Sequence, residues 1–161
     1  RPQANLVVTR KLTNYCLGLY ATPGYLAGHP PIAEREDLNG HAILAYVDDL
    51  LFTRELMYHH GLCRHPRMPL RNTSVVAQKE AALAGGGIAV LPYYMVYDDA
   101  RLVQVLPELR IVRSYWISAR SNIRRTLRYR VVWDYVVDLC QRMQWLLLQQ
   151  PTQQNESIDA G

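Results

Sequence analysis

The sequence predicts an α/β fold built on a mainly parallel β-sheet. Short apolar runs, bounded by glycine or proline, alternate with segments that carry helix caps or a helical apolar period. Four of these runs are His41–Tyr46, Met68–Arg71, Ile88–Leu91 and Leu102–Leu106. Because parallel strands need a crossover between them, strands that alternate with helices are typical of this fold class.

The N-terminal part of the chain predicts short elements. Two extended runs are expected first, at Leu6–Val8 and Leu17–Tyr20. A proline–glycine pair ends the second run, and short helical turns are expected at Gly24–Ala27 and Glu36–Leu38. The strand at His41–Tyr46 follows and is expected to be buried.

Two central helices are predicted from their end signals. Asp48 is a suitable N-cap for a helix at Leu50–His60, and Gly61 stands where a left-handed residue often ends a helix. The second helix follows the caps of Asn72–Ser74 and ends at Gly85–Gly87. At least one of these three glycines is expected to have a positive φ.

The C-terminal part predicts a strand at Ile111–Ser118 and then the longest helix of the chain. Apolar residues of this helix recur at spacings of three and four, which predicts one buried face. The residues assigned to that face are Val132, Tyr135, Val136, Leu139, Cys140, Met143 and Leu147.

The composition describes an ordinary globular domain. The chain has 161 residues, about half of them hydrophobic and a fifth charged, with a formal net charge of +4. No apolar run approaches the ~20 residues that a membrane span needs. The three cysteines form no C-x-x-C pair, which favours a reducing, cytoplasmic compartment. An arginine group around residues 120–130 is better explained as a solvated surface than as a nucleic-acid contact.

Candidate binding residues follow the ends of the predicted parallel strands. Ligands of such sheets sit at the carboxyl ends of strands, beside helix N-termini with free N–H groups. Helix capping or a core edge can explain the same residues without any ligand. The candidate effector-binding residues are Tyr46, Val47, Asp49, Asn72, Thr73, Ser74, Pro92 and Tyr93.

A metal site and an active site are both disfavoured. His59, His60, Cys63 and His65 are ligand types that zinc accepts, but no second cluster accompanies them. A helix end near the surface is the preferred explanation, since histidines are favoured there, so we expect no metal and no cofactor. The chain contains no G-x-S-x-G motif, and its Gly85–Gly87 run is not a phosphate-binding loop. We therefore expect a protein that is not an enzyme.

Three segments, taken in order, resemble the effector-binding domain of LysR-type transcription regulators. Leu17–His41 is similar to the family's "ASPAYL" turn followed by "E-D-L-x-x-H". Arg71–Pro92 is similar to "R-S-x-S…A-x-x-A-G-x-G-I-A-x-L-P". Leu102–Ser118 is similar to "L-V-x-V-L-P…L-W-L-V". The resemblance extends from about Asn5 to Met143.

The resemblance implies a three-layer sandwich of the periplasmic-binding-protein type II class. It implies an oligomeric regulator that binds a small effector in a cleft between two subdomains, and DNA only through an N-terminal domain outside this sequence. Residues 1–113 would form the second subdomain with its hinge strand. Residues 114–150 would be the crossover strand and C-terminal helix of the first, and residues 151–161 a disordered tail. A periplasmic-type solute-binding protein is the alternative with the same architecture, and a metal-binding domain is the second.

Overall fold

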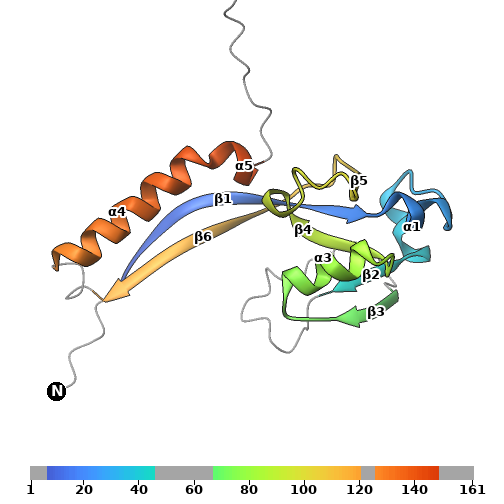
Figure 1. Cartoon of the computed structure of the whole chain (residues 1–161), viewed down its shortest axis with the longest axis horizontal. Helices are drawn as coiled ribbons and strands as arrows, with labels where there is room; N and C mark the ends of the chain where they lie inside the picture. Colours follow the sequence, from blue (N-terminus) through green and yellow to red (C-terminus); the bar gives the residue numbers. More distant parts are fainter. Residues whose placement is uncertain (1–6, 46–66, 121–125, 149–161) are drawn as a thin grey trace, which may run out of the picture. The chain divides into compact units, whose positions relative to one another are not determined.

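The computed structural model describes residues 7–45, 67–120 and 126–148 (Figure 1). The chain divides into two compact units, Leu17–Ile111 (unit 2) and Arg1–Cys16 with Val112–Gly161 (unit 1). The helix expected at Leu50–His60 and the tail at 151–161 lie outside the described residues. The assignment of residues 114–150 to the family's first subdomain stays a prediction.

The first strand, β1, runs without a break from Val7 to Ala21. The sequence predicted two short strands here, and this prediction is wrong. The middle of β1 is polar and has no strong strand pattern of its own, but it pairs with the late strand β6 (Ile111–Arg120). The side chains of Asn14 and Ser114 hydrogen bond across this pair at 2.8 Å. The partner strand therefore continues β1 where the local sequence does not.

Unit 2 is built on a mixed sheet in the order β3-β2-β4-β1-β5. Strand β2 is parallel to both β3 and β4, whereas β1 is antiparallel to β4 and β5. The four strands other than β1 therefore point the same way. The elements of unit 2 that follow β1 are α1 (Pro23–Ala27), η1 (Arg35–Gly40), β2 (Ala42–Ala45), β3 (Arg67–Arg71), α3 (Val75–Leu83), β4 (Ile88–Pro92), η4 (Tyr93–Met95) and β5 (Val103–Val105).

Helix α3 ends at the glycine run, as the sequence predicts. Gly85 has φ +78°, and its N–H donates to the carbonyl of Ala82 at 2.9 Å. The N–H of Gly86 donates to Ala81 at 2.9 Å. This pair of bonds satisfies two carbonyls that the helix end leaves open. Gly87 has φ +148°, and its lack of a side chain allows the start of β4 to lie against the backbone of Ala42 in β2.

One buried cluster of unit 2 lies between α3 and the sheet, and Figure 1 shows α3 lying along β2 and β4. Apolar side chains from the strands, from α3 and from the segment after β4 meet there and are excluded from water. The buried cluster is Tyr20, Leu44, Ala82, Ala89, Leu91, Val96 and Leu102.

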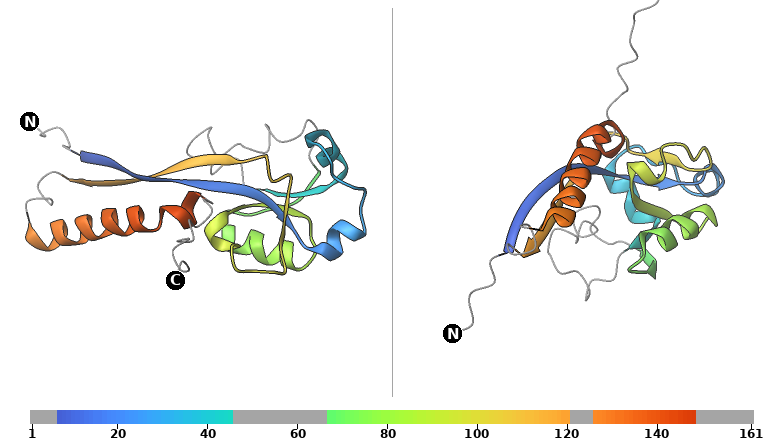
Figure 2. Two further views of the ribbon diagram at one scale, coloured as in Figure 1. Left: turned by 90° about the horizontal axis from the view of Figure 1, so that it is seen from above. Right: turned by 60° about the vertical axis from the view of Figure 1, so that its left-hand side comes forward.

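Unit 1 consists of the N-terminal part of β1, β6, α4 (Leu127–Arg142) and α5 (Gln144–Leu148). The arrows of β1 and β6 point in opposite directions in Figure 1, and the two strands lie side by side in both views of Figure 2. Thr9 and Ser118 hydrogen bond across the pair at 2.9 Å, and Tyr15 stacks on Tyr115 at 4.2 Å.

The predicted buried face of the last helix is wrong in part. Trp133 and Val137 are the buried residues of α4, and Val132, Tyr135 and Leu139 are exposed. The other predicted residues are half-buried: Val136, Cys140, Met143 and Leu147. Apolar residues lie on nearly every side of α4, so their spacing alone does not select the side that packs. The helix also ends at Arg142, and a separate short helix carries the remaining residues. No helix in the described part of the chain has the length and apolar character to span a membrane.

Candidate functional site

Three parallel strands of unit 2 end at one edge of the sheet. Strand β3 leads into Asn72–Ser74, and β4 ends at Pro92 and leads into Tyr93. Strand β2 lies between them, and the candidates that follow it (Tyr46, Val47 and Asp49) lie outside the described residues. Five of the eight sequence-derived candidates are thus at the same edge of the sheet, in two groups.

The Asn72–Ser74 turn is held by its own backbone and side chains. The N–H of Asn72 donates to the carbonyl of Ala45 at 3.0 Å, which ties the turn to the end of β2. The Asn72 Oδ1 accepts from the N–H of Ser74 at 2.7 Å, and the Ser74 Oγ accepts from the N–H of Ala77 at 3.3 Å. Asn72 and Ser74 therefore act as turn and helix caps. Thr73 is exposed between them.

Gln78 supports this turn from inside unit 2, a role that the sequence analysis missed. Its side chain is fully buried, and its Nε2 donates to the carbonyl of Asn72 at 2.9 Å. The Oε1 is buried without a hydrogen-bond partner among the described residues. The available signal was its spacing of four residues from the buried Ala82, because glutamine is usually exposed.

The first turn of α3 is electrostatically suited to an anion. The N–H groups of Val75 and Val76 precede the first possible intrahelical acceptors, so the helix itself leaves them without partners. The helix dipole adds partial positive charge at this end. No acidic residue lies in the first turn to compete for it. Together with the exposed Thr73 hydroxyl, these groups can hold a carboxylate or a phosphate.

The second group of candidates is more enclosed. Pro92 is buried within β4 and pairs with Leu17 of β1. Pro92 is therefore part of the sheet. Tyr93 is half-buried at the start of η4, and its ring lies 6.3 Å from that of Tyr97. Of these two residues, Tyr93 is the better placed to present a side chain at the carboxyl edge.

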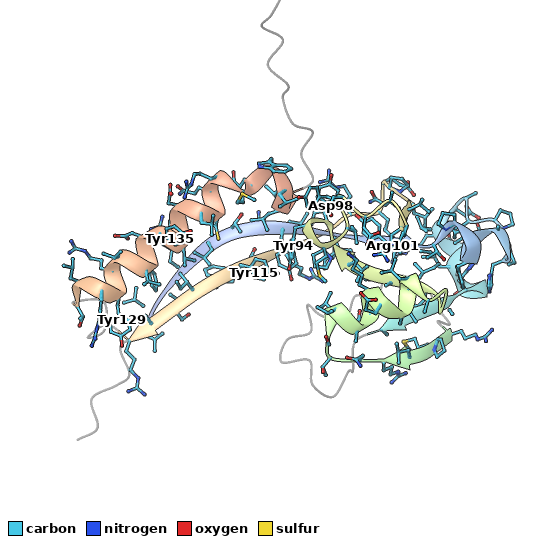
Figure 3. The ribbon with its side chains drawn as sticks, viewed as in Figure 1. Tyr94, Asp98, Arg101, Tyr115, Tyr129 and Tyr135 are labelled. Carbon is cyan, nitrogen blue, oxygen red and sulfur yellow. The ribbon has the colours of Figure 1, made fainter. Side chains whose placement is uncertain are left out.

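A charged network fixes α3 to the segment after β4. The Lys79 Nζ lies 3.0 Å from the Asp99 Oδ2 and donates to the carbonyl of Met95 at 2.7 Å. Arg101, labelled in Figure 3, donates to both carboxylate oxygens of Asp99, through its Nε at 2.8 Å and its Nη2 at 2.9 Å. Hydrogen bonds from Arg101 and Lys79 hold the pKa of Asp99 far below its ordinary value. The network stabilises the carboxylate and thereby the position of α3.

A buried histidine fixes the opposite part of unit 2. The Nδ1 of His41 lies 3.3 Å from the hydroxyl of Tyr25, which also accepts from the N–H of Ala42 at 3.0 Å. The ring of His29 stacks on Tyr25 at 4.0 Å. Burial lowers the pKa of His41, and the nearby His29 lowers it further, against smaller opposing effects from the Pro30 backbone and Asp37. The neutral form of His41 is therefore favoured in the folded protein.

No group of three or more histidine, cysteine or acidic side chains could hold a metal ion in the described parts of the chain. The candidate metal ligands His59, His60, Cys63 and His65 lie outside those parts, and they stay untested.

Comparison with known proteins shows similarity to one group of regulators. A family model described as the LysR substrate binding domain matches residues 1–141. The HTH-type transcriptional regulator PtxR of Pseudomonas aeruginosa is 32% identical over an alignment of 109 positions, which covers 63% of this chain and 34% of PtxR. The chain thus spans about a third of the length of this curated relative.

Solved structures show the same similarity at the level of the fold. CrgA of Neisseria meningitidis, a LysR-type transcriptional regulator, superposes with a TM-score of 0.65 at 24% identity, over 87% of this chain and 50% of CrgA. The regulatory domain of AphB from Vibrio vulnificus gives 0.64 at 22% identity, over 86% and 72% of the two chains. The Synechocystis CcmR regulatory domain, in complex with 2-PG, gives 0.63 at 18% identity, over 89% and 71%. The predicted fold, α/β of the periplasmic-binding-protein type II class, is confirmed.

Proposed function

Because this chain belongs to the family of LysR substrate binding domains, we propose that it is the ligand-sensing part of a transcription regulator. Its ligand is a small effector with an anionic group. Binding shifts the regulator between two conformations, and DNA contact and assembly respond to that shift. In this proposal the domain is not catalytic, and the regulator acts in the cytoplasm as a homo-oligomer. The family match favours this function over a solute-binding protein.

One observation supports the proposal of an anionic ligand. The exposed Thr73 lies between two residues that cap the turn and α3, directly before a first helical turn that carries no acidic residue. Capping accounts for Asn72 and Ser74, whereas the described residues offer no structural partner for the Thr73 hydroxyl. A hydroxyl and helix N–H groups that donate to an anion form the stronger, charge-assisted kind of hydrogen bond.

The test separates ligand binding from capping. Phosphate and a panel of small carboxylates are screened by thermal shift with the full chain, and the best anion is then titrated calorimetrically. Thr73→Val, which keeps the shape and loses the hydroxyl, should weaken binding about tenfold with an unchanged melting temperature. Thr73→Ser should retain binding. Ser74→Ala should lower the stability by about 1 kcal/mol because it removes the cap.

Equal affinity of the Thr73→Val variant and the parent for the anion would overturn the assignment. Loss of stability without loss of affinity would return Thr73 to a structural role. Absence of binding for every anion in the panel would contradict an anionic effector.

A further inference from the structure

The segment that joins β1 to β2, residues 22–41, is mostly exposed. It contains only the short elements α1 and η1, and three of its twenty residues are buried: Tyr25, Leu38 and His41. Two of these three are in contact, with the Nδ1 of His41 3.3 Å from the Tyr25 hydroxyl. A segment with few buried side chains opens at a lower free-energy cost than the sheet beside it. Its attachment to unit 2 therefore depends on Leu38 and on the contact between Tyr25 and His41.

The Tyr25 hydroxyl connects this segment to the first residue of β2. It accepts a hydrogen bond from the N–H of Ala42 at 3.0 Å. Its own proton can then be donated, and the neutral ring of His41 offers Nδ1 as the acceptor. A protonated ring carries N–H groups at both nitrogens and cannot accept that proton. Protonation of His41 therefore removes one hydrogen bond where the segment is attached to the strand.

The surroundings of His41 also oppose its protonation. The ring is fully buried, and its Nε2 has no hydrogen-bond partner among the described residues. The titratable groups that face it are Tyr25 of α1, His29 of the following loop and Asp37 of η1. The rings of His29 and His41 lie 5.8 Å apart, so a positive charge on one disfavours a charge on the other. Burial and His29 together lower the pKa of His41, against smaller effects from the Pro30 backbone and Asp37. The open segment, in which the ring meets water, therefore binds a proton more readily than the closed one.

We propose that Tyr25, His29 and His41 form an acid-sensitive switch, in which protonation of His41 releases residues 22–41 from unit 2. At neutral pH the uncharged ring holds the segment closed. Below pH 6.5, the ordinary pKa of histidine, the open state binds a proton that the closed state disfavours, so acid shifts the equilibrium toward opening. The switch lies at the amino end of β2, whereas the Asn72–Ser74 turn is tied to the carboxyl end of that strand. Acidity therefore acts on unit 2 at a point apart from the candidate anion site.

Hydrogen exchange of the ¹⁵N-labelled full chain between pH 7.5 and pH 5.5 tests the switch. The readout is the protection factor of the Ala42 amide, which corrects for the intrinsic pH dependence of exchange. It should fall several-fold over this range, with a limit of about tenfold for one proton on a group of pKa 6.5. The protection of Ala89 in β4 should not change. Asp37 stays ionised throughout, because the N–H groups of Glu34 and Ala33 donate to its carboxylate and lower its pKa.

Two single-histidine variants separate the causes. His41→Gln has no titrating ring at this position, so the protection of Ala42 should not depend on pH, and retained protection at Ala89 shows that the sheet is intact. His29→Gln keeps His41 and removes the neighbouring charge, so the fall should persist but be smaller. Equal falls in the parent and in His41→Gln, no fall in the parent, a fall of the same size at Ala89, or complete loss of the fall in His29→Gln would each overturn the proposal.

Discussion

Unit 2 buries its apolar side chains, whereas unit 1 leaves most of its large ones in contact with solvent. Among the described residues, eighteen of the twenty-one buried hydrophobic residues belong to unit 2. Eleven of the fourteen exposed large hydrophobic residues belong to unit 1. Unit 2 therefore has its own source of hydrophobic stabilisation, and unit 1 carries an apolar surface that favours association.

The contrast is visible within single elements. Strand β1 is exposed or half-buried at all but one of its first nine residues, and it is buried at every residue from Cys16 to Ala21. Helix α4 buries Trp133 and Val137 on one side, and leaves Leu127, Val131 and Tyr135 exposed at four-residue spacing on another. Figure 3 labels Tyr129 and Tyr135 along this helix. Side chains of the same type therefore contribute more to folding stability in unit 2 than in unit 1.

The largest expected effect comes from emptying the core of unit 2. Leu91→Ala removes a fully buried side chain from β4 and should lower the free energy of unfolding by about 2–5 kcal/mol. Leu127→Ala in unit 1 removes a side chain that is 70% exposed and should change it by less than about 0.5 kcal/mol. Urea unfolding followed by circular dichroism measures both. Equal losses would break the comparison between the units.

A glycine series tests how tightly the strands of unit 2 approach each other. Gly87→Ala should cost about 2 kcal/mol, because the new Cβ would collide with the carbonyl oxygen of Ala42 on the neighbouring strand. Gly85→Ala should cost about 1 kcal/mol, because only its φ of +78° is unfavourable. Gly40→Ala, with open space and no positive φ, is the control and should be close to neutral. Any other order among the three unfolding midpoints would contradict this account of the helix end.

The exposed surface of unit 1 should make the chain self-associate. Val132→Glu, at a position that is 60% exposed on α4, should weaken association at least about tenfold. Val76→Glu is the matched control, because Val76 is also 60% exposed but lies in unit 2. Light scattering over a concentration series measures the effect. A concentration-independent monomer mass for the parent chain would refute the prediction.

The smallest effect concerns acid and is confined to unit 2. The pKa of His41 is lower in the folded protein than its unfolded value of 6.5, so the folded state binds fewer protons. Its contribution to stability is present above pH 6.5 and is lost as the pH falls through the folded pKa. The parent should therefore lose more stability than His41→Gln between pH 7 and pH 5, measured by thermal unfolding. Parallel losses in the two proteins would remove His41 as the cause.

The tryptophans make these measurements specific for one unit. All three, Trp116, Trp133 and Trp145, belong to unit 1, so tryptophan fluorescence reports that unit alone. Circular dichroism reports both. A Leu91→Ala transition that is seen by circular dichroism at lower urea than by fluorescence would show that the units unfold separately.

Local signals predicted the parts of unit 2 in which structure is set by neighbouring residues. The caps at Asn72 and Ser74, the glycine end of α3 and the apolar strand β4 each depend on residues close in sequence. The continuity of β1 could not be predicted, because it depends on hydrogen bonds to residues about a hundred positions later. The packed face of α4 could be predicted only in part, because apolar residues lie on nearly every side of the helix.

The candidate site was predicted in part for the same reason. Periodicity and strand order predicted that Asn72–Ser74 and Tyr93 follow parallel strands, and the structure puts them at one edge of the sheet. The burial of Gln78 beneath the turn was not predicted, since a glutamine becomes buried only where a particular carbonyl needs a donor. Whether any of these residues binds an effector stays a prediction.

The pairing of β1 has a consequence for how fast the chain folds. Of the described strands, β1 is synthesised before all the others, yet its partners β4, β5 and β6 are synthesised only after β2 and β3. The bond between Thr9 and Ser118 closes a loop of 109 residues, and the entropy of closing such loops must be lost before the contacts form. A chain dominated by contacts of this kind has a high contact order and folds slowly. During synthesis β1 therefore remains without these partner strands until they are made. The longer it remains so, the more time two nascent chains have to pair incorrectly through it.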